Sequence, residues 1–263
     1  MALYGIVADI HGNSEALAAA LAALERRGIE RLLCLGDIVG YNADPDECAA
    51  MLQSRAALSI AGNHDLISLE RLGFSRCSNK ARHALKRTRR GLARATRDYL
   101  AALPAHRALD GGIVLVHGGV RDVQQYMVGA GLIGQNAAYL REDFPGARLC
   151  FFGHSHEQKV YRVAGDGVEE LASREQHVLE RAVLHFVNPG SVDASRKDAA
   201  KLAECAILDT QAWTLELLRL PYDAAAAEAK SAVFGYRLAP WAERMQALAR
   251  SVLRTDWRRA RAR

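Results

Sequence analysis

The sequence lacks the features that mark disulfide-stabilised, secreted and membrane-spanning proteins. Its five cysteines are odd in number and none forms a CxxC pair, so neither a disulfide framework nor a cysteine metal site is expected. No run approaches the 18 or so apolar residues of a membrane span, and the opening MALYGIVADIHGN lacks the basic region of a signal peptide. These absences predict a reduced, cytoplasmic protein that does not bind a membrane.

The composition that remains is that of an ordinary globular protein. Hydrophobic residues make up 50% of the 263 residues and charged residues 25%, which suits one large α/β domain or two small ones. The net charge of +5 favours anionic partners such as phosphates or nucleic acid, although solubility alone also accounts for it.

Short apolar runs alternate with helical patterns at the start of the chain. LYGIVAD, RLLCLGD and ALSIAGNHD are typical of buried strands. Between them lie two helical patterns, residues 13–27 with Asn13 as N-cap and Gly28 as stop, and PDECAAMLQSR with Pro45 in its first turn. This order predicts a parallel sheet covered by helices. Closely spaced later strand patterns, ending in AECAILDT and TLELLRL, predict an antiparallel second sheet and hence a sandwich.

Two segments carry helical patterns without strands. Residues 71–97 contain ten Lys or Arg and no Asp or Glu, which predicts a helical insertion with one basic face. That face either caps a site and attracts polyanions or is simply solvated, and both interpretations stay open. From Tyr222 onward the chain is Ala-rich and helical. Docking on the domain is the favoured interpretation there, with a dimer contact or nucleic-acid binding as alternatives.

Polar side chains follow five apolar runs, always at the carboxyl end: Asp9 and His11, Asp37, Asn63 with His64 and Asp65, His117, and His154 with His156. Each alone has an ordinary explanation as a helix cap, a turn residue or a buried histidine. Independent capping would not place every polar group at the same end of every strand. That edge of an open α/β sheet is where ligands bind, so we expect these residues to converge.

The converging side chains are carboxylates, imidazoles and one carboxamide, with no thiolate. Such a donor set suits Mn, Fe, Zn or Ni, and it is large enough for two ions held about 3.5–4 Å apart by a bridging carboxylate. In the stretch GHSH, positions two apart can face the same way. His154 and His156 can therefore both face one centre while Ser155 points away.

Together these residues resemble the calcineurin-like metallophosphoesterases. The likeness rests on five motifs in this order and spacing: Asp9-x-His11, Gly36-Asp37, Gly62-Asn63-His64-Asp65, His117-Gly118 and Gly153-His154-x-His156. DIHGNSEAL, GDIVGYNADPDEC and NPGSVDASR further resemble the small bacterial phosphodiesterase (YfcE-like) branch, and the similarity covers about residues 3–222. The resemblance implies an α/β fold, a four-layer α/β/β/α sandwich over residues 1–222. A helical basic cap at about residues 66–103 and a C-terminal helical extension, residues 223–263, would pack on this domain.

The resemblance also implies the role of each site residue. One metal would be held by Asp9, His11 and His156, the other by Asn63, His117 and His154, and both by Asp37. His64 would face the substrate without binding metal, and Asp65 would orient it. Mn²⁺ is the expected ion, with Fe, Zn and Ni as alternatives.

The implied reaction is hydrolysis of a P–O bond by hydroxide generated at the two metals, with His64 protonating the leaving oxygen. The expected substrates are phosphodiesters of small nucleotides or nucleic-acid ends. A phosphomonoesterase, a dinucleoside-polyphosphate hydrolase, a binding scaffold and a nucleic-acid-binding protein are the alternatives. The candidate substrate contacts are Arg121, Arg196, Tyr41 and Asn42. Whether the chain forms a homo-oligomer stays open.

Overall fold

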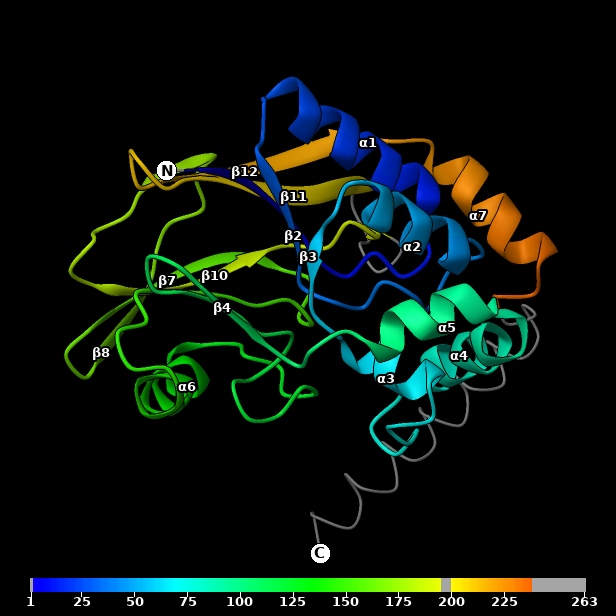
Figure 1. Cartoon of the computed structure of the whole chain (residues 1–263), viewed down its shortest axis with the longest axis horizontal. Helices are drawn as coiled ribbons and strands as arrows, with labels where there is room; N and C mark the ends of the chain where they lie inside the picture. Colours follow the sequence, from blue (N-terminus) through cyan, green and yellow to red (C-terminus); the bar gives the residue numbers. More distant parts are fainter. Residues whose placement is uncertain (1, 195–199, 238–263) are drawn as a thin grey trace, which may run out of the picture.

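The computed structural model describes residues 2–194 and 200–237, and its centre is a pair of six-stranded sheets packed face to face (Figure 1). Apolar side chains from both sheets, among them Ile6, Leu33, Phe151 and Leu208, form the core between them. Burial of these side chains is the main force that holds the two sheets together.

The first sheet has the strand order β3-β2-β1-β11-β12-β9. Its strands are β1 (Leu3–Val7), β2 (Arg31–Cys34), β3 (Leu58–Ser59), β9 (Gln176–Val178), β11 (Leu202–Asp209) and β12 (Thr214–Pro221). β1, β2 and β3 run parallel, as the alternation of strands and helices predicts. β11, β12 and β9 extend the sheet through antiparallel pairs.

The second sheet has the strand order β4-β5-β6-β10-β7-β8. Its strands are β4 (Arg107–Leu109), β5 (Ile113–Leu115), β6 (Leu149–Phe151), β7 (Gln158–Ala164), β8 (Gly167–Glu170) and β10 (Leu184–Pro189). β5, β6 and β10 are parallel, so the expectation of an antiparallel second sheet is wrong, and both sheets are mixed. The late strands β11 and β12 join the first sheet instead. Strand spacing identifies a hairpin but not the sheet edge that it joins, because long-range packing decides that.

Helices cover the outer face of each sheet. α1 (Ser14–Arg26) and α2 (Pro45–Ser54) lie over the first sheet, α7 (Ala224–Val233) packs beside α1, and α6 (Ala130–Asp143) lies over the second sheet (Figure 1). This is the expected four-layer α/β/β/α arrangement. α1 begins and ends as predicted, because Asn13 Oδ1 accepts a hydrogen bond from Ala16 N at 3.0 Å and Gly28 follows with φ +71°.

The remaining helices, α3 (Asn63–Ser68), α4 (Asn79–Gly91) and α5 (Arg94–Ala101), form a cluster at one end of the sandwich (Figure 1). We call residues 66–101, which follow Asn63, His64 and Asp65, the α3–α5 segment. Of the ten Lys and Arg in residues 71–97, six donate hydrogen bonds to main-chain carbonyl oxygens: Arg71, Arg76, Arg82, Arg87, Arg89 and Arg97. Much of the basic charge therefore holds this segment in place and is not simply a solvated face.

The described start of the C-terminal extension is tied to the first part of the chain. On α7, Lys230 Nζ lies 2.6 Å from both Asp44 Oδ2 and Glu15 Oε1, and Ser231 Oγ donates to Asn42 Oδ1 at 3.1 Å. Residues 238–263 lie outside the described residues, so the packing of the whole extension stays a prediction. None of the helices in the described part of the chain has the length and apolar character needed to cross a membrane.

Candidate metal centre

The polar residues that follow the strands meet at one edge of the sandwich. Asp9 follows β1 and Asp37 follows β2, which are parallel neighbours in the first sheet. His117 follows β5 and His154 follows β6, which are parallel neighbours in the second sheet. All four side chains are buried, and Asn63 at the start of α3 is buried as well. The carboxyl ends of two parallel pairs thus supply a single cluster.

The donor atoms of this cluster form three overlapping groups. Within each group, the donor atoms lie within 4.8 Å of one another. The groups are Asp9, His11 and His156; His11, Asp37 and His64; and Asp37, His117 and His154. The first group coincides with one implied metal-ligand set. The third contains three members of the other set. The middle group also brings His64 close to two candidate ligands, although the resemblance does not make it one.

The backbone of these residues is unusual. Eight non-glycine residues among those described have positive φ, and five of them belong to the cluster: Asp9, His11 and Asp37 at 53°, His154 at 65° and His156 at 61°. This left-handed region costs free energy for residues with a Cβ, so it persists only where the surrounding structure imposes it. The geometry turns consecutive donors out of the strand ends toward one point.

Glycine allows the two neighbouring strand ends of the first sheet to touch. A Cβ on Gly62 would lie 2.2 Å from both N and Oδ1 of Asp37, and a Cβ on Gly36 would lie 2.4 Å from Gly62 N. No side chain fits at either contact. The glycines before Asp37 and Asn63 therefore bring the loops after β2 and β3 close enough for their donors to share one site.

The first donor group is held by hydrogen bonds from the second sheet. His154 N donates to Asp9 Oδ2 at 3.0 Å, and Ser191 Oγ donates to Asp9 O at 3.0 Å. Nε2 of His156 lies 3.4 Å from Asp9 Oδ1 and 3.1 Å from His11 Nε2. These contacts join residues that are far apart in the sequence, so the group exists only when both sheets are assembled.

The other donor group centres on Asp37. His64 N donates to Asp37 Oδ1 at 2.7 Å, which leaves Oδ2 to face the imidazoles. His117 Nε2 lies 3.4 Å from that Oδ2 and 3.0 Å from Asn63 Oδ1, while its Nδ1 lies 2.8 Å from Leu35 O. A proton on Nδ1, donated to Leu35 O, would leave Nε2 of His117 as the donor atom for a metal.

The residues fit divalent metal ions. Metal–nitrogen bonds of about 2.0–2.1 Å place two nitrogen ligands of one ion roughly 3 Å apart, and His11 Nε2 and His156 Nε2 are 3.1 Å apart. Nε2 of His154 is buried and has no hydrogen-bond partner among the described residues. Buried polar atoms are rarely left without a partner, so such an atom in a cluster of carboxylates and imidazoles is suited to a ligand.

The protonation states of the cluster also suit metal binding. Burial opposes charge on Asp37, but the neighbouring His117 and His64 outweigh it and hold the pKa of Asp37 well below its ordinary value. Burial lowers the pKa of His154 to about 4, and burial together with His64 lowers that of His11. His117 is the exception, because Asp37 outweighs burial and raises its pKa to about 9. Near neutral pH the cluster thus contains an ionised carboxylate and imidazoles with free lone pairs.

His64 and Asp65 lie side by side at the start of α3, and their contacts differ. Both oxygens of Asp65 accept hydrogen bonds from main-chain N–H groups, Oδ1 from Ile38 and Val39 at 3.0 and 3.1 Å, and Oδ2 from Gly62 at 2.9 Å. Nδ1 of His64 is buried without a hydrogen-bond partner among the described residues. Asp65 therefore shapes the loop after β2 and the start of α3. Burial lowers the pKa of His64 from its ordinary value.

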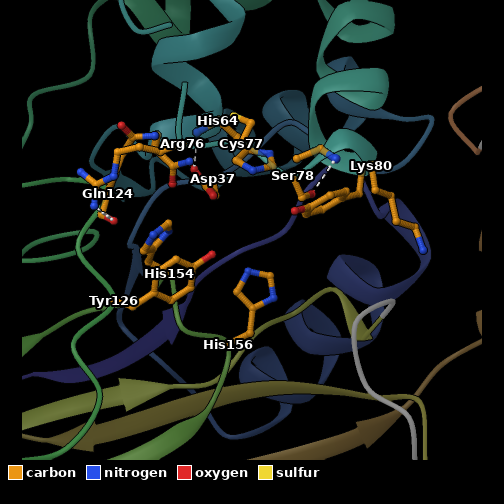
Figure 2. A pocket seen from close by; sticks show the side chains of 13 residues that line it. Asp37, His64, Arg76, Cys77, Ser78, Lys80, Gln124, Tyr126, His154 and His156 are labelled. Atoms are coloured by element: carbon orange, nitrogen blue, oxygen red, sulfur yellow. Dashed lines mark hydrogen bonds between the residues drawn. The ribbon is translucent and has the colours of Figure 1, made fainter. Parts of the chain in front are cut away.

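A cavity of about 460 Å³ opens beside the cluster (Figure 2). Asp37, Asn63, His64, His154 and His156 line it on the side of the donor groups. Tyr41 lines it as well, and sequence reasoning did not name the remaining wall residues, which are Arg76, Cys77, Ser78, Lys80, Ala81, Gln124 and Tyr126. The basic composition of residues 71–97 indicated a cap, but no local pattern indicated Gln124 or Tyr126.

The candidate substrate contacts have different positions. Tyr41 lines the cavity, with its ring centroid 4.7 Å from that of His11 and 4.9 Å from that of His64. Asn42 is buried and does not line it; its Nδ2 donates to His11 O at 3.2 Å, so it supports the loop that bears this candidate ligand. Arg121 also lies outside the cavity wall and pairs with Glu142 and Asp143. Arg196 lies outside the described residues.

Known proteins share this fold. The solved structure of a metallophosphoesterase from Sphaerobacter thermophilus is 29% identical, covers 87% of this chain and 92% of its own, and superposes with a TM-score of 0.72. A structure from Pyrococcus horikoshii OT3 is 19% identical, covers 88% of this chain and 92% of its own, and has a TM-score of 0.66, which shows the fold alone. An uncharacterized protein of Methanocaldococcus jannaschii is 29% identical over 226 residues, 84% of this chain and 88% of the relative.

A family model matches most of the chain. Residues 2–212 match the model of the calcineurin-like phosphoesterase superfamily domain. The matched range contains both sheets up to β11 and all the donor residues of the cluster. The chain therefore belongs to the calcineurin-like phosphoesterase superfamily and is a metal-dependent hydrolase of phosphoric ester bonds.

Proposed function

We propose that this chain is a phosphodiesterase with two metal ions that hydrolyses P–O bonds of small nucleotides or nucleic-acid ends. The proposal rests on the position of one carboxylate oxygen. Asp37 Oδ2 lies 3.8 Å from His11 Nε2 and 3.4 Å from His117 Nε2. The two histidines belong to different donor groups. A carboxylate oxygen between two donor groups is what a bridged pair of ions requires.

The proposed ligands are Asp9, His11 and His156 for one ion, Asn63, His117 and His154 for the other, and Asp37 for both. Bound ions, with Mn²⁺ as the expected species, would supply Lewis acidity toward the phosphoryl oxygens and a lowered pKa for water at the centre. The chain itself contributes preorganisation. Main-chain N–H groups of His154 and His64 already hold the carboxylates of Asp9 and Asp37, so little reorganisation accompanies binding.

His64 is the candidate donor of a proton to the leaving oxygen. Its side chain lines the cavity beside Asp37 and is otherwise buried. We expect His64→Ala to slow hydrolysis of an alkyl diester, whose alkoxide must be protonated, by about 10²–10⁴-fold. A nitrophenyl diester leaves as a stable anion and should be affected much less. Equal losses on both esters would contradict the acid role.

The function is tested with metal-stripped protein to which Mn²⁺, Fe²⁺, Zn²⁺, Ni²⁺ and Mg²⁺ are restored one at a time. The substrates are bis(4-nitrophenyl) phosphate and the monoester 4-nitrophenyl phosphate, and bound metal is counted by elemental analysis. We expect turnover of the diester that needs metal, with two ions per chain. Asp37→Asn should abolish this turnover, because the amide removes the shared charge between the donor groups.

The other outcomes identify the alternatives. Turnover mainly of the monoester would favour a phosphomonoesterase, and turnover only of a dinucleoside polyphosphate would favour a hydrolase of that class. One bound ion per chain would contradict the dinuclear centre. No turnover with any ion, in protein shown to be folded by circular dichroism, would favour a binding scaffold.

A further inference from the structure

One wall of the cavity includes an aromatic ring that is not among the proposed metal ligands. Tyr126 lines the cavity and lies beside His154 (Figure 2). The two ring centroids are 4.1 Å apart, and the planes are inclined by 35°. Although one part of the Tyr126 ring covers His154, 46% of the residue stays exposed. Tyr126 therefore offers aromatic surface to whatever occupies the cavity.

Exposed apolar side chains follow Tyr126 in the sequence. Six large hydrophobic side chains are exposed in the described part of the chain, and Tyr126, Val128 and Leu132 are three of them. They follow one another within residues 126–132, whereas the cations of the cavity wall, Arg76 and Lys80, come from the α3–α5 segment. The ring of Tyr126 therefore suits an uncharged planar part of a substrate.

The loop that bears Tyr126 is held in place by the α3–α5 segment. Arg76 Nη1 lies 2.7 Å from Asp122 Oδ2, and Arg76 Nη2 donates to Gln124 O at 2.6 Å. Gln124 N in turn donates to Asp122 Oδ1 at 2.9 Å. The ring is thus positioned before any ligand arrives, which lowers the entropic cost of stacking on it.

We propose that Tyr126 is the stacking surface for a nucleobase of the substrate, and that it makes this chain prefer nucleoside phosphodiesters over diesters without a ring. This inference rests on the proposed phosphodiesterase function and names its substrate class. A cavity of about 460 Å³ is within the range of small-molecule sites and has room for a nucleotide beside the donor groups. Every base has a π-face, so stacking selects for a ring without selecting one base.

The test compares two dinucleotides that differ only in their rings. One is thymidylyl-(3′→5′)-thymidine, and the other is its abasic analogue with both thymines replaced by hydrogen. For the metal-loaded protein we expect kcat/KM to be about tenfold or more higher for the first compound, mainly through KM. Tyr126→Ala should reduce this ratio to about one. Tyr126→Phe should keep the ratio, because it keeps the ring.

Tyr139→Ala is the matched control. Tyr139 lies on α6 beneath the guanidinium of Arg121 and does not line the cavity, so the ratio should stay as in wild type. Equal kcat/KM values for the two dinucleotides, or a preference that survives Tyr126→Ala, would overturn the inference. Hydrolysis of bis(4-nitrophenyl) phosphate but of neither dinucleotide would overturn it too. No hydrolysis of any of the three diesters would instead refute the phosphodiesterase proposal.

Discussion

The cluster of donor residues at the strand ends and the α3–α5 segment line the same cavity, but their charged side chains make different contacts. In the cluster, carboxylates and imidazoles are almost wholly buried, and several sit on left-handed backbone. In the α3–α5 segment, guanidinium groups bind main-chain carbonyl oxygens, as Arg89 Nε binds Ile67 O at 2.7 Å. The charged groups of the cluster are placed to bind a ligand, whereas six arginines of the segment hold the segment and the loops beside it in place.

This difference has a physical basis. Left-handed backbone at a non-glycine residue costs of order 1–3 kcal/mol, so the conformation of the cluster persists only because the two packed sheets impose it. An Arg–carbonyl hydrogen bond stabilises the folded state without strain. Substitutions in the cluster should therefore remove metal and activity, and those in the segment should loosen one wall of the cavity.

The largest effect is expected from Gly62→Ala. The added Cβ would lie 2.2 Å from Asp37 N, and neither backbone can yield without moving a ligand. We expect the free energy of unfolding to fall by about 3 kcal/mol and bound metal to be lost, as measured by urea denaturation and elemental analysis. Gly73→Ala is the control in the α3–α5 segment, because no atom lies within 4 Å of the position that its Cβ would take. Equal stability of the two variants would disprove the close contact.

Metal should stabilise the chain through the cluster and not through the segment. An ion at 100 times its Kd raises the free energy of unfolding by about 2.7 kcal/mol per site. We expect the urea midpoint to rise when Mn²⁺ replaces a chelator, and this rise should largely disappear in Asp37→Asn. It should be unchanged in Arg89→Ala. An Asp37→Asn protein that keeps the whole rise would show that metal binds elsewhere.

A smaller effect is expected in the segment itself. Arg89 binds Ile67 O, and its guanidinium lies 4.3 Å from the ring centroid of Phe74. Arg89→Ala should lower the free energy of unfolding by about 1.5 kcal/mol and speed amide exchange in α3 and α4. Arg90→Ala makes the same charge change at a residue whose side chain has no hydrogen bond among the described residues. If Arg90→Ala had the same effect, net charge and not the Arg–carbonyl contact would hold the segment.

The smallest effect is expected from Arg121→Ala. Arg121 pairs with Glu142 and Asp143 on the surface, where ion pairs contribute roughly 0–1 kcal/mol. We expect kcat/KM for bis(4-nitrophenyl) phosphate within about twofold of wild type, since Arg121 does not line the cavity. A loss of tenfold or more would restore the sequence-based prediction that Arg121 touches phosphate.

Local patterns were enough to predict the parts of the molecule that depend on neighbouring residues. The caps of α1 at Asn13 and Gly28 involve contacts within a few residues, and they lie where the sequence indicates. Asp9 and His117 each end an apolar run, so their location at strand ends was predictable too. The pairing of β11 and β12 with the first sheet was not, because apolar patterning does not specify the sheet that buries a hairpin.

By itself, therefore, the sequence indicated α1, α2, the strands β1, β2, β5 and β6, and the candidate donor residues that follow these strands, because hydrophobic period and chain order are local properties. Only the tertiary structure decided that Asp37 lies between His11 and His117, and that Arg76 holds the loop of Tyr126 against the cavity. Those contacts join residues dozens of positions apart. They depend on how two sheets and a helical segment pack together, and no local pattern encodes that.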